Sequence, residues 1–166
     1  MTKLRKQAMA AVGPCLSPMS AFLLLTGLET LPLRMERQCE TAQRVAAYLR
    51  EHPRVVKVSY PGLPDHPAHD LSRAHFKGRF GGVLSFHLEN KAECFQVLNN
   101  FDLIRRSTNL GDTRTLAIHP ASTIYGTFWK HEQEEVGVTE DMIRLSLGIE
   151  HPADILADFD QALAAA

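Results

Sequence analysis

Apolar and polar residues alternate along residues 141–150, DMIRLSLGIE, in a pattern that predicts a β-strand. Side chains on a strand point alternately to opposite faces, so one face is apolar and the other carries polar or small residues. The apolar face comprises Ile143, Leu145, Leu147 and Ile149, and the opposite face comprises Met142, Arg144, Ser146 and Gly148. A positive charge beside a small hydroxyl and near a glycine indicates a strand whose backbone another group approaches closely. The positive charge predicts that this group is an anion.

Two helices are predicted before residue 53. Ser17 is a suitable N-cap, and the residues after it are apolar on nearly all sides, so we expect this first helix to be buried. Pro32 should break or kink the chain. The second helix then carries an apolar stripe opposite a charged side. The stripe consists of Met35, Cys39, Ala42, Val45, Ala46 and Leu49.

The remaining residues alternate between short strands and helices. Strands are expected at 54–59, 80–88, 103–106, 116–119 and 142–149, and helices within 63–78, from Asn90 to Leu98, at 130–137 and from Pro152 onward. This order predicts an α/β fold, specifically an α+β two-layer sandwich in which helices cover one face of a mostly antiparallel sheet of four to five strands. The face with Arg144 would be left uncovered, as suits a domain that expects a neighbour.

Composition limits the chain to one ordinary folded unit and excludes two classes of partner. The 166 residues are 45% hydrophobic, and 18 basic against 19 acidic residues give a net charge of −1. No block of five like charges occurs, so neither nucleic acid nor a membrane surface is an expected partner. The apolar run at 21–25 is far shorter than the ~20 residues that span a bilayer. Cys15, Cys39 and Cys94 are widely spaced, which predicts reduced core residues of a cytoplasmic protein.

The sequence contains no recognisable catalytic or metal motif. Neither the Walker spacing nor GxGxxG is present, and His66 and His69 in DHPAHD lack the spacing of a structural zinc site, so no metal is expected. Arg144 is the best functional candidate: it either pairs with a surface carboxylate or binds the carboxylate of a ligand through two parallel hydrogen bonds. Asn109 either donates its amide to the same anion or holds its own turn.

Five segments of the chain carry a resemblance to a known family. They are residues 16–42, LSPMSAFLLLTGLETLPLRMERQCETA; 58–63, VSYPGL; 81–86, GGVLSF; 109–123, NLGDTRTLAIHPAST; and 138–163, VTEDMIRLSLGIEHPADILADFDQAL. In this order they resemble the C-terminal part of the Cys/Met metabolism family of pyridoxal-phosphate (PLP) enzymes. NLGD followed by HPASTIY is most similar to the O-acetylhomoserine sulfhydrylases. Cystathionine synthases, cystathionine lyases and methionine γ-lyases usually carry serine in place of Asn109.

The resemblance implies a domain organisation and a reaction. Residues 1–52 would be linking helices and 53–166 the small C-terminal domain of a fold-type-I enzyme, whose large PLP-binding domain is absent from this chain. The implied reaction is γ-replacement on O-acetylhomoserine by sulfide or a thiol, which gives homocysteine or methionine. Arg144 would grip the α-carboxylate of the amino-acid substrate, and the turn with Asn109 would close on the same group. Ile124 and Tyr125 replace the Thr-His that family members often carry, so the resemblance implies no substrate contact by a threonine hydroxyl at that place. Thr123 would be only a neighbour of this site.

The resemblance also implies what the chain lacks. The Schiff-base lysine belongs to the large domain, and none of the six lysines here stands in the Ser-x-Thr-Lys setting of the family. We therefore expect no catalytic residue in this chain, no tight binding of PLP and no turnover by the chain alone. The complete enzyme would be a homotetramer.

Two other interpretations remain open. One is a cystathionine γ-synthase or methionine γ-lyase domain. The other is a stand-alone α/β binding or dimerisation module in which Arg144 is paired internally.

Overall fold

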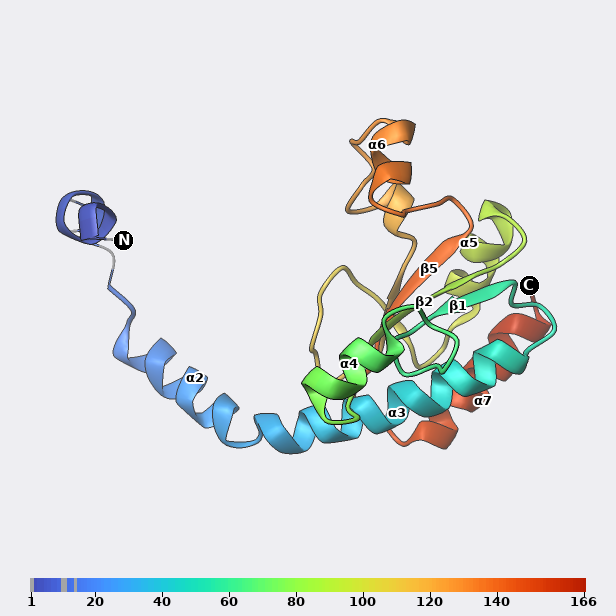
Figure 1. The fold of residues 1–166 in the computed structure, drawn as a ribbon, viewed down its shortest axis with the longest axis horizontal. Helices are drawn as coiled ribbons and strands as arrows, with labels where there is room; N and C mark the ends of the chain where they lie inside the picture. Colours follow the sequence, from blue (N-terminus) through green and yellow to red (C-terminus); the bar gives the residue numbers. More distant parts are fainter. Residues whose placement is uncertain (1, 10–11, 14) are drawn as a thin grey trace. The chain divides into compact units, whose positions relative to one another are not determined.

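The structure is a computed structural model that describes residues 2–9, 12–13 and 15–166 (Figure 1). The chain divides into two compact units, Met1–Leu33 and Arg34–Ala166. Within the described residues no helix is both long enough and apolar enough to cross a membrane.

The elements described in the first unit are η1 (Leu4–Met9) and α2 (Pro18–Glu29). As predicted, Ser17 caps α2: its hydroxyl accepts a hydrogen bond from the backbone N–H of Ser20 at 3.2 Å. The expectation that this helix is buried is wrong, because no residue of α2 is buried and Leu23, Leu24 and Leu25 are each about 60% exposed. A helix that is apolar on all sides needs protein around its whole circumference, which the described chain does not provide.

A break separates α2 from the next helix, α3 (Leu31–Glu51), as Pro32 predicted. The predicted stripe faces the core from Ala42 to Leu49, whereas Met35 is 38% exposed. Gln38 and Thr41 are buried as well, which the apolar pattern did not reveal.

The second unit is built around a five-stranded sheet in the order β1-β2-β5-β4-β3. The strands are β1 (Lys57–Ser59), β2 (Val83–His87), β3 (Arg105–Arg106), β4 (Leu116–Ile118) and β5 (Met142–Ser146). All neighbouring pairs are antiparallel except β3 and β4, so the predicted mostly antiparallel α/β sheet is confirmed.

Helices α3 and α7 (Pro152–Ala164) lie side by side across one face of this sheet (Figure 1). Phe159 of α7 joins the layers, since its ring packs against Tyr48 of α3 and edge-on against Phe86 of β2. The predicted inward residues Ile143, Leu145 and Leu147 are fully buried here. Ile149 lies beyond the end of β5 and is 39% exposed. The remaining helices are α4 (His69–Phe76), α5 (Lys91–Asn100), η2 (Pro120–Ser122) and α6 (Lys130–Glu135).

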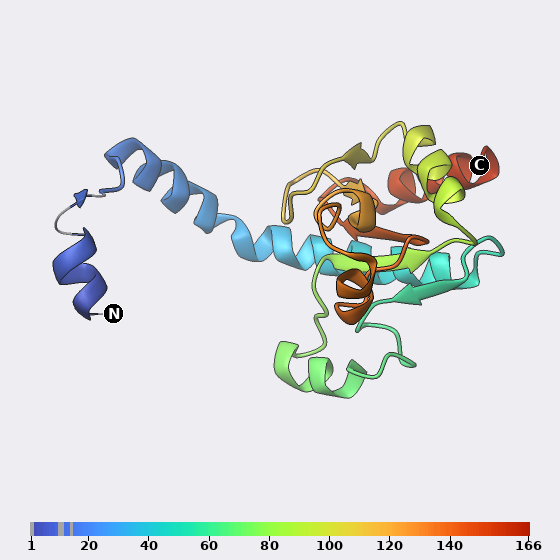
Figure 2. The ribbon, with the colours of Figure 1, turned by 90° about the horizontal axis from the view of Figure 1, so that it is seen from above.

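The opposite face of the sheet is not left bare. Figure 1 and Figure 2 show η2 and α6, in orange, on the other side of the sheet from α3 and α7. Leu116 and Ile118 of β4 point to this face and are 3% and 4% exposed. The expectation of an uncovered face therefore needs correction: residues between β4 and β5 cover part of it and leave a hollow above Arg144.

Candidate functional site

Arg144 lies in a row of residues that crosses four strands. The pairing register places Ser59 opposite Ser85, Ser85 opposite Arg144, and Ile118 opposite Arg144. Directly paired residues in neighbouring strands project from the same face. The small hydroxyls of Ser59 and Ser85 therefore flank the arginine on one side and leave space above the sheet.

The guanidinium of Arg144 is held by backbone carbonyls and by no carboxylate. Its Nη2 donates to the carbonyl of Thr108 at 2.9 Å and to that of Asn109 at 3.5 Å. Its Nε is shielded from solvent and has no hydrogen-bond partner in the described part of the chain. Among the described residues no carboxylate lies within ion-pair distance of Arg144, so the structure does not support the interpretation of an arginine paired with a surface carboxylate.

Burial lowers the pKa of the Arg144 guanidinium, and the side chain of Tyr125 opposes this shift electrostatically. An arginine starts from so high a pKa that it stays charged at neutral pH. The site thus holds a half-buried positive charge that no carboxylate of the described residues neutralises. Such a charge favours an anionic ligand.

The turn that contributes these carbonyls is anchored to β5. The backbone N–H of Gly111, which has φ of +73°, donates to the hydroxyl of Ser146 at 3.2 Å. Beyond the turn, the carboxylate of Glu150 accepts from the backbone N–H and hydroxyl of Thr115 at 2.7 and 2.8 Å. A Cβ on Gly148 would come within 2.5 Å of the Thr113 carbonyl oxygen. The small residues beside Arg144 therefore make room for the chain's own turn, which corrects the expectation that an anion needs this space.

Asn109 meets Arg144 through its backbone carbonyl rather than its amide. The residue is exposed, and none of the side-chain bonds in the described part of the chain involves its amide. Asp112 performs the turn-holding role instead, since its carboxylate accepts from the backbone N–H of Arg114 at 3.0 Å. The amide of Asn109 is thus exposed and has no hydrogen-bond partner among the described residues.

A hollow of about 330 Å³ lies above Arg144. Its floor is the row of Ser59, Ser85 and Arg144, and its wall comes from the segment between β4 and β5. The wall includes Pro120, Ile124, Tyr125, Val136, Gly137 and Val138. Tyr125, Ser85 and Ser59 were not predicted as site residues from the sequence, although residues 83–87 alternate and Ser85 is a polar position in them.

Thr123 does not line this hollow. Its hydroxyl donates to the carbonyl of His119 at 2.7 Å, while the neighbouring Ile124 and Tyr125 face the hollow. The structure thus brings Arg144 and the turn of Asn109 together but leaves the hydroxyl of Thr123 bound to backbone.

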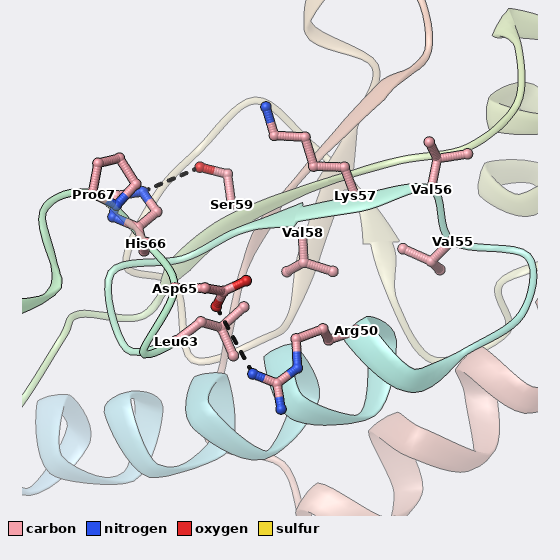
Figure 3. A pocket seen from close by; sticks show the side chains of 10 residues that line it. All are labelled: Arg50, Val55, Val56, Lys57, Val58, Ser59, Leu63, Asp65, His66 and Pro67. Carbon is pink, nitrogen blue, oxygen red and sulfur yellow. Dashed lines mark hydrogen bonds and ion pairs between the residues drawn. The ribbon is translucent and has the colours of Figure 1, made fainter.

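A second hollow, of about 360 Å³, lies along the edge strand β1 beside α3 (Figure 3). Arg50 lies between two carboxylates there, with Asp65 at 3.9 Å and Glu51 at 3.1 Å. The hydroxyl of Ser59 lies 3.4 Å from Nε2 of His66, as Figure 3 shows. Ser59 borders both hollows.

The residues around Arg144 do not form a site for PLP itself. A PLP enzyme of this kind needs a lysine that bonds the cofactor. No lysine lines the Arg144 hollow: Lys57 lies on the edge strand β1, Lys91 pairs with Glu140 at 3.2 Å, and Lys130 begins α6. The hollow therefore suits the carboxylate end of a small ligand and not the cofactor.

Comparisons with known proteins agree with this architecture. The sequence model described as Cys/Met metabolism PLP-dependent enzyme matches residues 1–164. O-acetyl-L-homoserine sulfhydrylase 1 of Thermus thermophilus is 44% identical over 165 residues, which cover 99% of this chain and 39% of the relative. L-methionine gamma-lyase of Fusobacterium nucleatum subsp. polymorphum is 40% identical over 152 residues, which cover 91% of this chain and 38% of the relative.

A solved structure shows the same relationship in three dimensions. It is a putative O-acetylhomoserine (thiol)-lyase from Campylobacter jejuni that holds a pyridoxyl-lysine monophosphate. The match has a TM-score of 0.89 and 35% identity, and covers 98% of this chain and 39% of that one. The chain thus spans about two fifths of the length of the relatives that it matches. It belongs to the Cys/Met metabolism family of PLP-dependent enzymes.

Proposed function

We propose that this chain is the substrate-carboxylate-binding domain of a PLP-dependent enzyme that carries out γ-replacement on O-acetylhomoserine. Sulfide or a thiol would be the second substrate, and homocysteine or methionine the product. The observation that carries the proposal is the guanidinium of Arg144, which two backbone carbonyls hold at the floor of a hollow and which has no carboxylate partner among the described residues. Two relatives at 44% and 35% identity are named as O-acetylhomoserine enzymes, which supports the choice of this substrate.

Arg144 would bind and orient the substrate. Two of its N–H groups would grip the α-carboxylate and fix the direction of the amino acid, while the exposed amide of Asn109 would donate to the same group. Thr123 would act indirectly, since its hydroxyl bond to His119 shapes the wall beside Ile124 and Tyr125.

The cofactor would be held elsewhere in the complete enzyme. The Schiff-base lysine and the phosphate-binding residues would belong to a large domain outside this chain, with residues 1–52 as the link and 53–166 as the small domain. The exposed apolar side chains of α2 are consistent with such a link, because they need further protein to cover them. The chain alone would neither bind PLP tightly nor turn over substrate. The complete enzyme would be a cytoplasmic homotetramer.

A γ-elimination on methionine is the second candidate. Its support is the L-methionine gamma-lyase at 40% identity, which matches nearly the same part of the chain. The interpretation as a stand-alone module is weaker, because it expects an internal partner for the charge of Arg144 and the described residues supply no carboxylate.

A chimera provides the test. The matching 165 residues of the Thermus thermophilus sulfhydrylase are replaced with this chain, and two products are measured: homocysteine from O-acetylhomoserine and sulfide, and 2-oxobutyrate from methionine. We expect homocysteine formation, with Arg144→Ala raising the KM for O-acetylhomoserine about 30-fold or more, as for a lost charge-assisted bond of about 2 kcal/mol or more. Arg105→Ala, on the exposed edge strand β3, is the matched control and should change nothing.

Three outcomes would contradict parts of the proposal. An unchanged KM in Arg144→Ala would remove the carboxylate-binding role. Elimination from methionine without γ-replacement would favour the second candidate. Near-stoichiometric binding of PLP by the isolated chain, seen as an absorbance band, would contradict the placement of the cofactor site.

A further inference from the structure

The ring of His66 orients the hydroxyl of Ser59. The backbone N–H of Ala68 donates to Nδ1 of His66 at 3.1 Å, so Nδ1 is an acceptor and carries no proton. In the neutral ring the proton must then reside on Nε2, which lies 3.4 Å from the Ser59 oxygen (Figure 3). Nε2 therefore donates to Ser59. The hydroxyl proton of Ser59 remains free to donate to something else.

That free proton belongs to a residue that faces the Arg144 hollow. Ser59 borders the hollow, and the pairing register aligns it with Ser85 and Arg144 on one face of the sheet. Neighbouring strands lie about 4.8 Å apart, so the Cα atoms of Ser59 and Arg144 are separated by about 10 Å. Both residues line the same hollow, and the Arg144 guanidinium is held there by the carbonyls of Thr108 and Asn109. A short amino acid gripped at its carboxylate by Arg144 would therefore reach toward Ser59 with its far end.

The surroundings between the two residues suit a short aliphatic chain. Ser85 is small and occupies the middle of the floor, and Ile124 and Val136 form apolar parts of the wall. Methylene groups would lie against this wall, whereas an oxygen at the far end would meet the Ser59 hydroxyl.

We propose that Ser59, oriented by His66, donates a hydrogen bond to the carbonyl oxygen of an acyl group at the far end of an amino acid whose carboxylate is bound by Arg144. The ligand class is an amino-acid ester. A thioether such as methionine offers only a weakly accepting sulfur at this end and gains little from the bond. This inference rests on the proposed function and adds a selectivity for acylated substrates to it.

The test compares two ligands that differ at the carbonyl. The isotope-labelled full chain is titrated by NMR with O-acetyl-L-homoserine and with L-ethionine, which has a similar length and shape but no carbonyl. The Arg144 Nε–H signal reports carboxylate binding, and the Ser59 amide signal reports the far end. A neutral hydrogen bond contributes about 0.5–1.5 kcal/mol, so we expect the ester to bind about 2–10-fold more tightly.

Variants separate the hydroxyl from the fold. Ser59→Ala should lower the affinity for the ester to that for ethionine and leave ethionine unchanged, and His66→Ala should reduce the preference because the hydroxyl loses its orientation. Ser122→Ala is the matched control: its hydroxyl also pairs with a histidine, His119, at 2.8 Å, but Ser122 does not line the hollow. It should keep the full preference.

The outcomes distinguish the two proposals. If neither ligand shifts the Arg144 signal, carboxylate binding fails and this inference fails with it. If both ligands bind at Arg144 with equal affinity, or if Ser59→Ala retains the preference for the ester, the role of Ser59 is overturned while the carboxylate site stands.

Discussion

Gly148 lies against the backbone of Thr113, so that a Cβ at position 148 would come within 2.5 Å of the Thr113 carbonyl oxygen. The same Cβ would also lie within 2.5 Å of the carbonyl carbon of Arg114. This contact fixes residues 113–115 against the end of β5. It therefore helps to place the turn whose carbonyls hold Arg144.

Gly148→Ala should destabilise the chain and displace this turn. The Cβ would meet the Glu150 carboxylate and the backbone of Thr113 and Arg114. The backbone atoms cannot move aside as a flexible side chain can, so we expect a loss of about 1–3 kcal/mol in the free energy of unfolding. Urea denaturation followed by circular dichroism measures it. Gly137→Ala is an informative comparison, since nothing lies within 4 Å of its Cβ and only its positive φ of 75° creates strain. It should cost about 1 kcal/mol. An unchanged stability in Gly148→Ala would show that the turn is not held by this contact.

Only part of the structure around Arg144 could be predicted from the sequence, for a physical reason. The alternation along β5 correctly separated buried Ile143 and Leu145 from the face of Arg144, because it depends only on strand geometry. The small size of Ser146 and Gly148 correctly predicted that another group approaches this face of the strand. The pattern did not identify that group. The approaching segment is the chain's own turn, more than 30 residues earlier in the sequence, and such a tertiary contact leaves no local signal.

The same limit applies to the helices and to the cysteines. The N-caps at Ser17 and Asn90 were predictable from neighbouring residues, and both accept the expected backbone bond. The burial of α2 could not be predicted from neighbouring residues, because burial depends on what surrounds the helix. Of the three expected core cysteines only Cys94 is buried, where burial raises the pKa of its thiol to about 12, while Cys15 is exposed. Tyr125 and Ser59 could not be predicted as site residues, because only the wall of the hollow and the pairing of the strands bring them near Arg144.

Arg144→Met should remove carboxylate binding without a comparable loss of stability. The guanidinium is half-buried, and its Nε has no partner among the residues that the structure describes. Its shortest hydrogen bond is to a single carbonyl, that of Thr108. A partly buried charge without a counter-charge contributes little to folding, and an apolar replacement of similar length keeps the packing. We expect the free energy of unfolding to change by less than about 1 kcal/mol, measured by urea denaturation. A loss above about 2 kcal/mol would indicate a structural arginine and weaken the functional assignment.

Asp158→Ala should be among the most damaging substitutions in the chain. Its buried carboxylate accepts from the backbone N–H groups of Asp102, Leu103 and Ile104 at 2.9, 3.1 and 2.8 Å, and so connects α7 to the segment before β3. The substitution leaves these donors without their acceptor, and we expect a loss of about 3 kcal/mol or more, seen as a lower melting temperature. Asp154→Ala, in the exposed first turn of α7, should cost less than about 1 kcal/mol through the helix dipole. Equal losses in the two variants would contradict this account.

Asp141 should make stability depend on pH in the acid range. Burial alone would raise the pKa of its carboxyl, but hydrogen bonds from the Thr139 hydroxyl, its own backbone N–H and the His87 ring outweigh burial and lower the pKa below its ordinary value. A carboxyl with a lowered pKa in the folded state stabilises the fold above its unfolded pKa of about 3.9, and this contribution is lost as the pH falls through the folded-state pKa. The free energy of unfolding should therefore decline below about pH 4.

Asp141→Asn isolates this contribution. Urea denaturation between pH 6 and pH 2 should show that the stability difference between the wild-type chain and Asp141→Asn is constant above about pH 5 and shrinks below pH 4. Thr139→Val removes one of the bonds that lower the folded-state pKa, so its loss of stability on acidification should begin at the same pH, be smaller, and be complete at a higher pH than in the wild-type chain. A wild-type and Asp141→Asn difference that stays constant down to pH 2 would show that the carboxyl titrates alike in the folded and unfolded chains, and that its bonds to Thr139 and His87 do not stabilise its charged form.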